Sequence, residues 1–448
     1  MKVCVLGLWH LGTVTAACLA SGGHGVTGLD FDPAVVAGLA AGRPPLFEPG
    51  LETLVTEGLA AGRLRFTTDV STAVGDADII WVAYDTPVDD DDRADVEYVI
   101  QRAAKLAPHV RHDAFVLISS QVPVGTTRRL ERMFASHAPG HTVGFGYSPE
   151  NLRLGKAIDA FTHPDRVVVG VRDEVDVEKV RELLQPFTDR IEWMSVESAE
   201  MTKHALNAFL ATSVTFINEI AALCEQVGAD ATEVERGLKS ESRIGPNAYL
   251  SPGGAFAGGT LARDVVFLSE LGQAHGVATS LFSSVTSSND AHRQWAERRL
   301  SQLLGGVAGK TVAIWGLTYK PGTDTLRRSS AVRLCHWLRA HGAAVRAHDP
   351  AVTDVPPDLA VCMHRADSAL AAVDGASALV VATPWPEYRE VAADHVVRRM
   401  ARPLVLDANR YLGDTLGTHG DVEYLSVGKP TAREGREPHE RKEPCLDP

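Results

Sequence analysis

Short apolar segments alternate with helical stretches over the first 195 residues of the chain. The apolar segments are rich in β-branched residues and mostly uncharged, namely KVCVLGL, GVTGLDF, ADIIWVAY, AFVLISS, TVGFGYS and RVVVGV. Strands of a parallel sheet have this composition because helices bury them on both faces. The alternation therefore predicts a doubly wound, Rossmann-like α/β domain over residues 1–195.

Hydrophobic positions take a helical spacing between residues 196 and 300. The segment SAEMTKHALNAFLATSVTFINEIAALCEQVGA is nearly free of glycine and proline, so it predicts one long helix. It is too long for an ordinary surface helix, and we expect it to form a spine between two domains or a dimer contact. Residues 196–300 are therefore predicted to form a central helical dimerisation region.

A second α/β pattern begins near residue 308, with GKTVAIWGL, AVRLCHWLRAHGAAVRAHD, ASALVVATPW and RPLVLDAN in strand–helix–strand order. Residues 301–415 are predicted to form a second Rossmann-like domain. The polar, proline-rich residues 416–448 are expected to form a disordered tail. The predicted fold class is α/β, with two doubly wound domains joined by a long central helix.

The composition and charge of the chain argue against some classes of binding partner. A chain of 448 residues with a net charge of −13 argues against a nucleic-acid surface or an anionic membrane partner. We expect no apolar run to approach the ~20 residues that span a membrane. The six cysteines are scattered without a C-x-x-C pair, which indicates a reducing, cytoplasmic compartment and no metal site.

The N-terminus allows two interpretations. MKVCVLGLWHLGTVTAACLASGG has a lysine, an apolar run and small residues, as a secretory signal does. The alternative is a buried strand, a glycine turn and a helix. The following HGVTGLDFD continues a βαβ unit and favours the second interpretation.

In that βαβ unit the turn GLWHLG is typical of a dinucleotide site. Gly7 permits the turn, Gly12 permits close packing, and Asp30 ends the next strand, where it can accept hydrogen bonds from the adenosine ribose. Acidity at Asp30 favours NAD over NADP. Trp9 replaces the middle glycine, so its indole must point away or reshape the contact. Gly7, Trp9, Leu11, Gly12 and Asp30 are the candidate cofactor residues of this turn.

Three polar turns follow strands of the first domain. Thr86 lies in YDTP, Gln121 in SSQVPVGTT and Glu150 in SPENLRLGKA. Ligands bind at the carboxyl ends of the strands in a doubly wound sheet. The alternatives are plain turns for the first two and a capped helix start for the third. On the functional interpretation Thr86 and Gln121 contact the cofactor, and Glu150 acts near a sugar or a bound water.

Two further groups of polar residues carry candidate chemistry. Lys203 and Asn207 share one face of the long helix, where they either meet solvent or enter an active site and stabilise negative charge. Lys320 and Arg327 follow a strand of the second α/β domain and, with Arg243, suit a diphosphate. This basic set stands out against the acidic whole.

Taken in order, these motifs resemble the UDP-glucose/GDP-mannose dehydrogenase family up to about residue 415. The most specific parts are PENLRLGKAIDAF, KHALNAFLA, the glycine-rich loop GGAFAGGTLARD and GLTYKPGTDTLRRSS. The resemblance implies an NAD domain, a helical dimer core and a C-terminal domain that binds a nucleotide-sugar. Members oxidise the C6 alcohol of such a sugar to a carboxylate with two NAD, as in polysaccharide biosynthesis, and a homodimer is expected.

The resemblance also implies roles for single residues. Lys203 and Asn207 would stabilise oxyanions, Asp264 would help to activate water, and Thr260 and Glu150 complete the catalytic set. Arg327 would contact the cofactor. The residues that would contact the nucleotide-sugar are Arg153, Arg243, Phe256, Gly258 and Lys320.

The chain departs from the family pattern at five positions near cofactor or chemistry. Thr260 stands where the family has the cysteine that captures the intermediate aldehyde. Arg263 replaces the loop lysine, Leu154 a second glutamate and Gln121 a threonine, and Trp9 is the fifth change. A thiol near pKa 8.5 gives some thiolate at neutral pH, whereas an unassisted threonine hydroxyl gives essentially none.

Three hypotheses follow from these departures. The chain is an NAD-dependent oxidoreductase of a UDP-glucose-like nucleotide-sugar that stops at the 6-aldehyde, because hydride removal does not need the thiol. Alternatively it is a redox-neutral epimerase with retained NAD, or a non-catalytic nucleotide-sugar-binding protein. Trp9 favours the last hypothesis, whereas the presence of Lys203, Asn207, Asp264 and Glu150 speaks against it.

Overall fold

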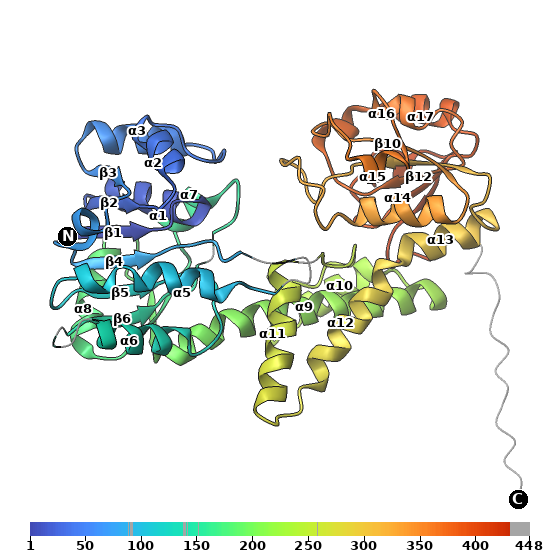
Figure 1. Ribbon diagram of the computed structural model, residues 1–448. Helices are drawn as coiled ribbons and strands as arrows, with labels where there is room; N and C mark the ends of the chain where they lie inside the picture. Colours follow the sequence, from blue (N-terminus) through green and yellow to red (C-terminus); the bar gives the residue numbers. More distant parts are fainter. Residues whose placement is uncertain are drawn as a thin grey trace, which may run out of the picture. The chain divides into compact units, whose positions relative to one another are not determined.

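The computed structural model describes residues 1–87, 89, 93–137, 140, 142–150, 152–257 and 259–430. It forms two compact units, Met1–Leu206 and Asn207–Pro448. Figure 1 shows a sheet covered by helices in each unit. The two units are described separately below.

The first unit is built on an eight-stranded sheet of order β3-β2-β1-β4-β5-β6-β7-β8. All neighbouring strands pair in parallel except β6 and β7, which are antiparallel. The first six positions have the strand order of a dinucleotide-binding sheet. In such a sheet the sequence order of the strands reverses at one point, which here lies between β1 and β4. The strands are β1 Lys2–Leu6, β2 Gly25–Leu29, β3 Leu64–Thr67, β4 Ile79–Val82, β5 Phe115–Ile118, β6 Gly144–Tyr147, β7 Val167–Val171 and β8 Ile191–Met194.

Helices cover both faces of this sheet, which explains why its central strands are mostly apolar. Val3 and Val5 of β1 pack with α1 and α8, whereas Cys4 and Leu6 pack with α5 and α6. The helices are α1 His10–Ser21, α2 Pro33–Ala40, α3 Leu51–Ala60, α4 Val70–Val74, α5 Val96–Ala104, η1 Ala107–His109, α6 Thr126–His137, α7 Ala157–Thr162 and α8 Glu174–Leu184.

Helix α9, Val196–Val227, is 32 residues long, begins in the first unit and ends in the second. By length and composition alone it could cross a membrane, which corrects the expectation that no segment approaches that length. Core helices of soluble proteins pass the same test. The buried side of α9 carries Glu200, Lys203, Asn207 and Glu225, each held by polar contacts within its own unit.

The second unit contains a six-stranded, fully parallel sheet of order β11-β10-β9-β12-β13-β14. Its core also includes Ala221 and Cys224 of α9. The strands are β9 Thr311–Trp315, β10 Ala344–His348, β11 His364–Arg365, β12 Ala378–Val381, β13 Leu404–Asp407 and β14 Glu423–Leu425. The helices are α10 Ala231–Ser240, α11 Thr260–Ala274, α12 Ser280–Arg293, α13 Trp295–Leu304, α14 Ser330–Ala340, α15 Pro357–Ala360, α16 Ala369–Ala372, η2 Pro386–Glu390, α17 Ala393–Arg399 and η3 Leu416–Thr418.

Strand β14 corrects the expected start of the tail at residue 416. It pairs with β13, and Leu416, Leu425 and Val427 are buried, so the ordered chain continues past that boundary. The backbone N–H of Gly428 donates to Glu225 Oε1 at 2.9 Å. Residues 431–448 of the predicted tail lie outside the described residues.

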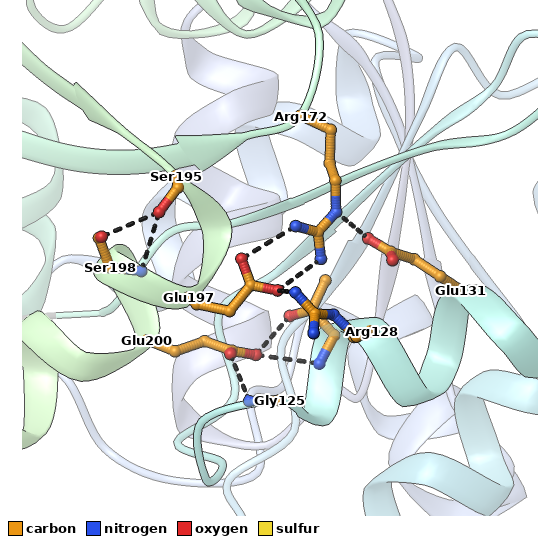
Figure 2. Close-up of polar contacts among 9 residues, drawn as sticks. Gly125, Arg128, Glu131, Arg172, Ser195, Glu197, Ser198 and Glu200 are labelled. Atoms are coloured by element: carbon orange, nitrogen blue, oxygen red, sulfur yellow. Dashed lines mark hydrogen bonds and ion pairs between the residues drawn. The ribbon is translucent and has the colours of Figure 1, made fainter.

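An ion-pair network joins the start of α9 to α6 and to the end of β7 (Figure 2). Arg172 donates to both carboxylate oxygens of Glu197 at 2.9 Å and to Glu131 at 2.7 Å. Arg128 donates to Glu197 at 2.8 Å. The Arg172 guanidinium lowers the pKa of Glu197 from 4.5 to about 2. A carboxyl with a lowered pKa stabilises the fold above its unfolded pKa and loses that contribution as the pH falls.

We predict that Glu197→Gln lowers the free energy of unfolding at pH 7 by about 1 kcal/mol, because the network is bidentate but partly solvent-exposed. The difference from the native chain should shrink as the pH falls from 4.5 toward 2. Urea unfolding across this range measures both, and Glu192→Gln, at an exposed position of β8, is the control. A difference that stays constant with pH would contradict the prediction.

Candidate active site

The turn between β1 and α1 needs glycine at two positions. Gly7 has a φ of +92°, in the left-handed region that other residues rarely adopt. A Cβ added at Gly12 would lie 1.6 Å from the carbonyl oxygen of Gly7. The first turn of α1 therefore packs directly on the strand end, as a dinucleotide-binding turn requires.

Trp9 stands at the position of the middle glycine, directly before helix α1. Its φ of −87° is available to any residue, so this position does not need glycine. The side chain is 52% exposed, so the indole lies toward solvent and does not fill the turn. A φ outside the left-handed region and an exposed side chain are both compatible with tryptophan at this position.

Asp30 lies just beyond the end of β2 and is fixed against the same turn. Its Oδ2 accepts from the backbone N–H of Leu8 at 2.7 Å, and its Oδ1 accepts from Asp32 N–H at 3.0 Å. Carboxylate oxygens can accept further hydrogen bonds, so this arrangement suits ribose hydroxyls. The buried Leu11 donates its backbone N–H to Asp85 Oδ2 at 3.3 Å, a contact that the sequence pattern did not signal. The close-packed turn and the fixed carboxylate fit NAD.

The predicted polar turns of the first unit are connected at the carboxyl edge of its sheet. Thr86 Oγ1 donates to the carbonyl oxygen of Gln121 at 2.8 Å. Ser119 Oγ donates to the carbonyl oxygen of Ser148 at 2.7 Å and accepts from Trp81 Nε1 at 2.8 Å. Thr86 and Gln121 are thus neighbours, and the turn that carries Glu150 lies next to them.

Lys203 and Glu150 are brought together in the first unit. Lys203 is 6% exposed; its Nζ donates to the carbonyl oxygen of Glu150 and lies 3.7 Å from Glu150 Oε1. Glu150 Oε2 accepts from the backbone N–H of Leu152 at 2.8 Å. Glu150, a predicted catalytic residue, and Leu11, a predicted cofactor residue, line the same cavity of about 80 Å³. A buried ammonium here can stabilise negative charge on oxygen.

In the second unit, side-chain amides hold the start of the glycine-rich loop. Asn218 Oδ1 of α9 accepts from Gly253 N–H at 3.0 Å, and Asn409 Oδ1 accepts from Gly254 N–H at 2.9 Å. The ring Nε2 of His292 lies 2.8 Å from the carbonyl oxygen of Gly253. Burial lowers the pKa of His292, so its ring is neutral at pH 7.

Phe256, predicted to contact the substrate, is fixed through its backbone. Asn289 accepts from its N–H and donates to its carbonyl oxygen, both at 3.0 Å. Arg293 adds a second donor to that oxygen at 3.2 Å. A loop held this way keeps its shape without relying on side-chain packing.

Helix α11 begins at Thr260, directly after Gly259, whose φ is +97°. Thr260 is exposed at this helix N-terminus, a position that favours anions. Further along α11, Asp264 is 1% exposed and accepts from Asn207 Nδ2 of α9. The predicted pair Asn207 and Asp264 is therefore in direct contact.

The other predicted substrate and cofactor residues differ in their exposure. Arg243 has a side chain 86% exposed and pairs with Glu241 at 3.0 Å. Arg153 and Arg327 are exposed and Lys320 is half-buried. Gly258 lies outside the described residues.

The described cysteines offer no evident substitute for a loop thiol. All five of them are free, and burial raises the pKa of Cys4, Cys18 and Cys335 to about 12. Cys362 is half-buried and lies 3.1 Å from His336 of α14. Asparagine, histidine and arginine side chains contact the backbone of the loop at Gly253, Gly254 and Phe256.

Sequence reasoning missed several residues that hold this site. Glu48 is buried and accepts from Gly155 N–H at 2.8 Å, from Ala157 N–H at 2.9 Å and contacts His10 at 3.1 Å. An isolated glutamate between two turns carries no periodic signal. Glu200 did carry one, because it lies three residues before Lys203 and four before His204 on the same helix. The loop-holding asparagines lie far from the loop in sequence and had no local signal.

Three domain models of the UDP-glucose/GDP-mannose dehydrogenase family match the chain. The NAD-binding domain matches residues 1–188, the central domain residues 197–291 and the UDP-binding domain residues 313–414. The UDP-glucose 6-dehydrogenase of Pseudomonas aeruginosa is 36% identical over 96% of this chain and 98% of its own. That of Rhizobium meliloti is 35% identical over 96% of this chain and 100% of its own.

Solved structures show the same likeness. The UDP-glucose dehydrogenase of Pyrobaculum islandicum superimposes with a TM-score of 0.84 at 30% identity, covering 96% of this chain and 98% of its own. With the fold, the cofactor turn and the matched domains in agreement, the chain belongs to the UDP-glucose/GDP-mannose dehydrogenase family. It is an NAD-dependent enzyme of the nucleotide-sugar dehydrogenase type, and its C-terminal domain is the UDP-binding domain of the family.

We predict that Gly12→Ala abolishes NAD binding and destabilises the chain by about 3 kcal/mol, because its Cβ would overlap the Gly7 carbonyl. Calorimetric titration with NAD and thermal unfolding measure the two effects. Gly237→Ala in α10 is the control: its Cβ meets no atom within 4 Å, so NAD affinity should not change. Native NAD affinity in the Gly12 variant would contradict the prediction.

Proposed function

We propose that this enzyme oxidises the C6 hydroxymethyl group of a UDP-glucose-like nucleotide-sugar once and releases the 6-aldehyde. The observation that carries the proposal is Thr260, which occupies the loop position where the family has its cysteine. The alcohol loses a hydride and a proton, and the products are the aldehyde, NADH and a proton. NAD, when bound, supplies the two-electron acceptor.

The missing thiol limits the reaction to this first step. Conversion of an aldehyde to an acid by the family route needs a covalent adduct on sulfur, from which a second hydride leaves. An unassisted threonine hydroxyl is essentially un-ionised at neutral pH and is a poor nucleophile. Burial raises the pKa of Cys4, Cys18 and Cys335, which makes these three thiols poor replacements for the loop cysteine.

The first step can proceed with the residues that the chain has. We assign Lys203 and Asn207 to stabilise the developing alkoxide, since both are polar, buried and four residues apart on α9. Glu150 sets the environment of Lys203 through its carboxylate at 3.7 Å. Asp264 holds the amide of Asn207 and so orients it.

The ligands follow from the matched domains. The UDP-binding domain supports a uridine nucleotide, and the relatives named UDP-glucose 6-dehydrogenase support glucose as its sugar. On the same basis Lys320 and Arg243 are assigned to the diphosphate, and Arg327 to the cofactor. Arg153, Phe256 and Gly258 complete the proposed substrate contacts.

A homodimer through α9 is part of the proposal. Phe209, Phe216 and Leu223 recur every seven residues on one stripe of the helix, and they are 67%, 46% and 61% exposed. An apolar stripe of this spacing is typical of a helix that packs on a partner. Light scattering should give twice the chain mass of 48.0 kDa, and a monomer would remove this part of the proposal.

The free cysteines support a cytoplasmic location, which fractionation of the producing cells would test.

The test of the function is to incubate the purified chain with NAD and UDP-glucose, alongside other nucleotide-sugars, and to identify the products by mass. We expect NADH and a product lighter than the substrate by two hydrogen atoms, which a hydrazine reagent traps as an aldehyde. A carboxylate product would contradict the assignment of Thr260. An isomer without net NADH would favour the epimerase alternative, and binding without turnover would favour a non-catalytic protein.

A further inference from the structure

One turn of α9 holds the edge of the cofactor sheet through buried polar groups. Glu200 is 0% exposed, His204 3% and Lys203 6%. The contacts of Lys203 with Glu150 belong to the proposed reaction. Glu200 and His204 contact a different segment, the connection between β5 and α6.

Glu200 caps helix α6 from outside that helix. Its carboxylate accepts from the backbone N–H of Gly125 at 2.6 Å, from Thr127 N–H at 2.9 Å and from Thr127 Oγ1 at 2.7 Å (Figure 2). The first N–H groups of a helix have no partner within it, and a negative charge there is favoured by the helix dipole. Three donors on one buried carboxylate offset the cost of burying the charge.

The capped segment is the polar turn that carries Gln121. His204 Nε2 lies 3.1 Å from the carbonyl oxygen of Val122, so α9 holds this turn at its middle as well as at its end. The carbonyl oxygen of Gln121 receives Thr86 Oγ1 at 2.8 Å. The shape of the edge where a dinucleotide binds therefore depends on α9, which is not part of the cofactor sheet.

We propose that Glu200 is a positioning residue for the cofactor. By capping α6 it fixes the turn of residues 119–127, and through this turn it sets the affinity of the enzyme for NAD. The proposal rests on the NAD-binding domain and on the predicted contact of Gln121. It is independent of whether the product is an aldehyde or an acid.

Glu200→Gln tests the proposal with little change in side-chain volume. A glutamine offers one carbonyl oxygen to three donors and turns its NH₂ group toward N–H groups that need acceptors. We expect NAD to bind about tenfold more weakly, as the loss of hydrogen bonds to a buried charge implies. UDP should bind within about twofold of the native chain, because the UDP-binding domain lies elsewhere in the sequence.

Glu197→Gln is the matched control, three residues earlier on the same helix. It loses the ion pairs with Arg172 and Arg128 but leaves the cap on α6 in place. We expect it to lower thermal stability while NAD and UDP affinities stay within about twofold of native. A purely structural role of Glu200 would make the two variants lose stability alike and leave NAD affinity unchanged in both.

Thr127→Val decides the case if the first unit of Glu200→Gln does not fold, as judged by a helix signal in circular dichroism well below that of the native chain. It removes only the hydroxyl bond to Glu200, and we expect NAD to bind about threefold more weakly with UDP binding kept. Calorimetric titration measures all of these affinities. NAD binding within experimental error of native in the folded Glu200 variant, or in the Thr127 variant if the former does not fold, would overturn the proposal. Equal NAD losses in the Glu200 and Glu197 variants would overturn it too.

Discussion

Helix α9 carries two buried carboxylates, and each of them fixes the helix to its neighbours within one of the two units. Glu200 accepts three hydrogen bonds from the start of α6 in the first unit. Glu225 accepts from Trp295 Nε1 at 3.0 Å, from Arg299 at 2.9 Å and from Gly428 N–H in the second. A buried charge is stable only when it is fully satisfied, so each carboxylate demands one arrangement of its neighbours. Because these hydrogen bonds fix the rotation of α9 about its axis within each unit, they also decide where its other polar side chains lie.

Lys203 and Asn207 illustrate the consequence. Both are buried because the helix around them is anchored, and each meets one predicted catalytic partner within its own unit. Lys203 contacts Glu150, and Asn207 contacts Asp264. A long polar side chain held by neighbouring hydrogen bonds loses little freedom on reaction, which is how an enzyme prepares for charge in a transition state. The glycine-rich loop is prepared in the same manner, by asparagine amides on its backbone.

Most of the fold of the first unit could be predicted from the sequence, but less of the candidate active site could. Strand composition predicted the doubly wound sheet, because strands buried on both faces are apolar throughout, and Gly7, Gly12 and Asp30 marked the turn through local geometry. Contacts between distant segments had no such signal: Glu48 joins three segments, and Asn289 reaches the loop from another helix. The boundary at residue 416 was wrong because β14 has only three residues, too few to show a strand pattern in the sequence.

We propose that the second oxidation is absent because residue 260 bears a hydroxyl group in place of a thiol. The most direct measurement is the number of NADH molecules formed per UDP-glucose consumed, in the native chain and in Thr260→Cys, with Thr260→Ser as control. We expect one NADH per UDP-glucose for the native and serine chains. For the cysteine chain we expect a rise toward two, with carboxylate as product. Two NADH from the native chain, or no rise in the cysteine variant, would contradict it.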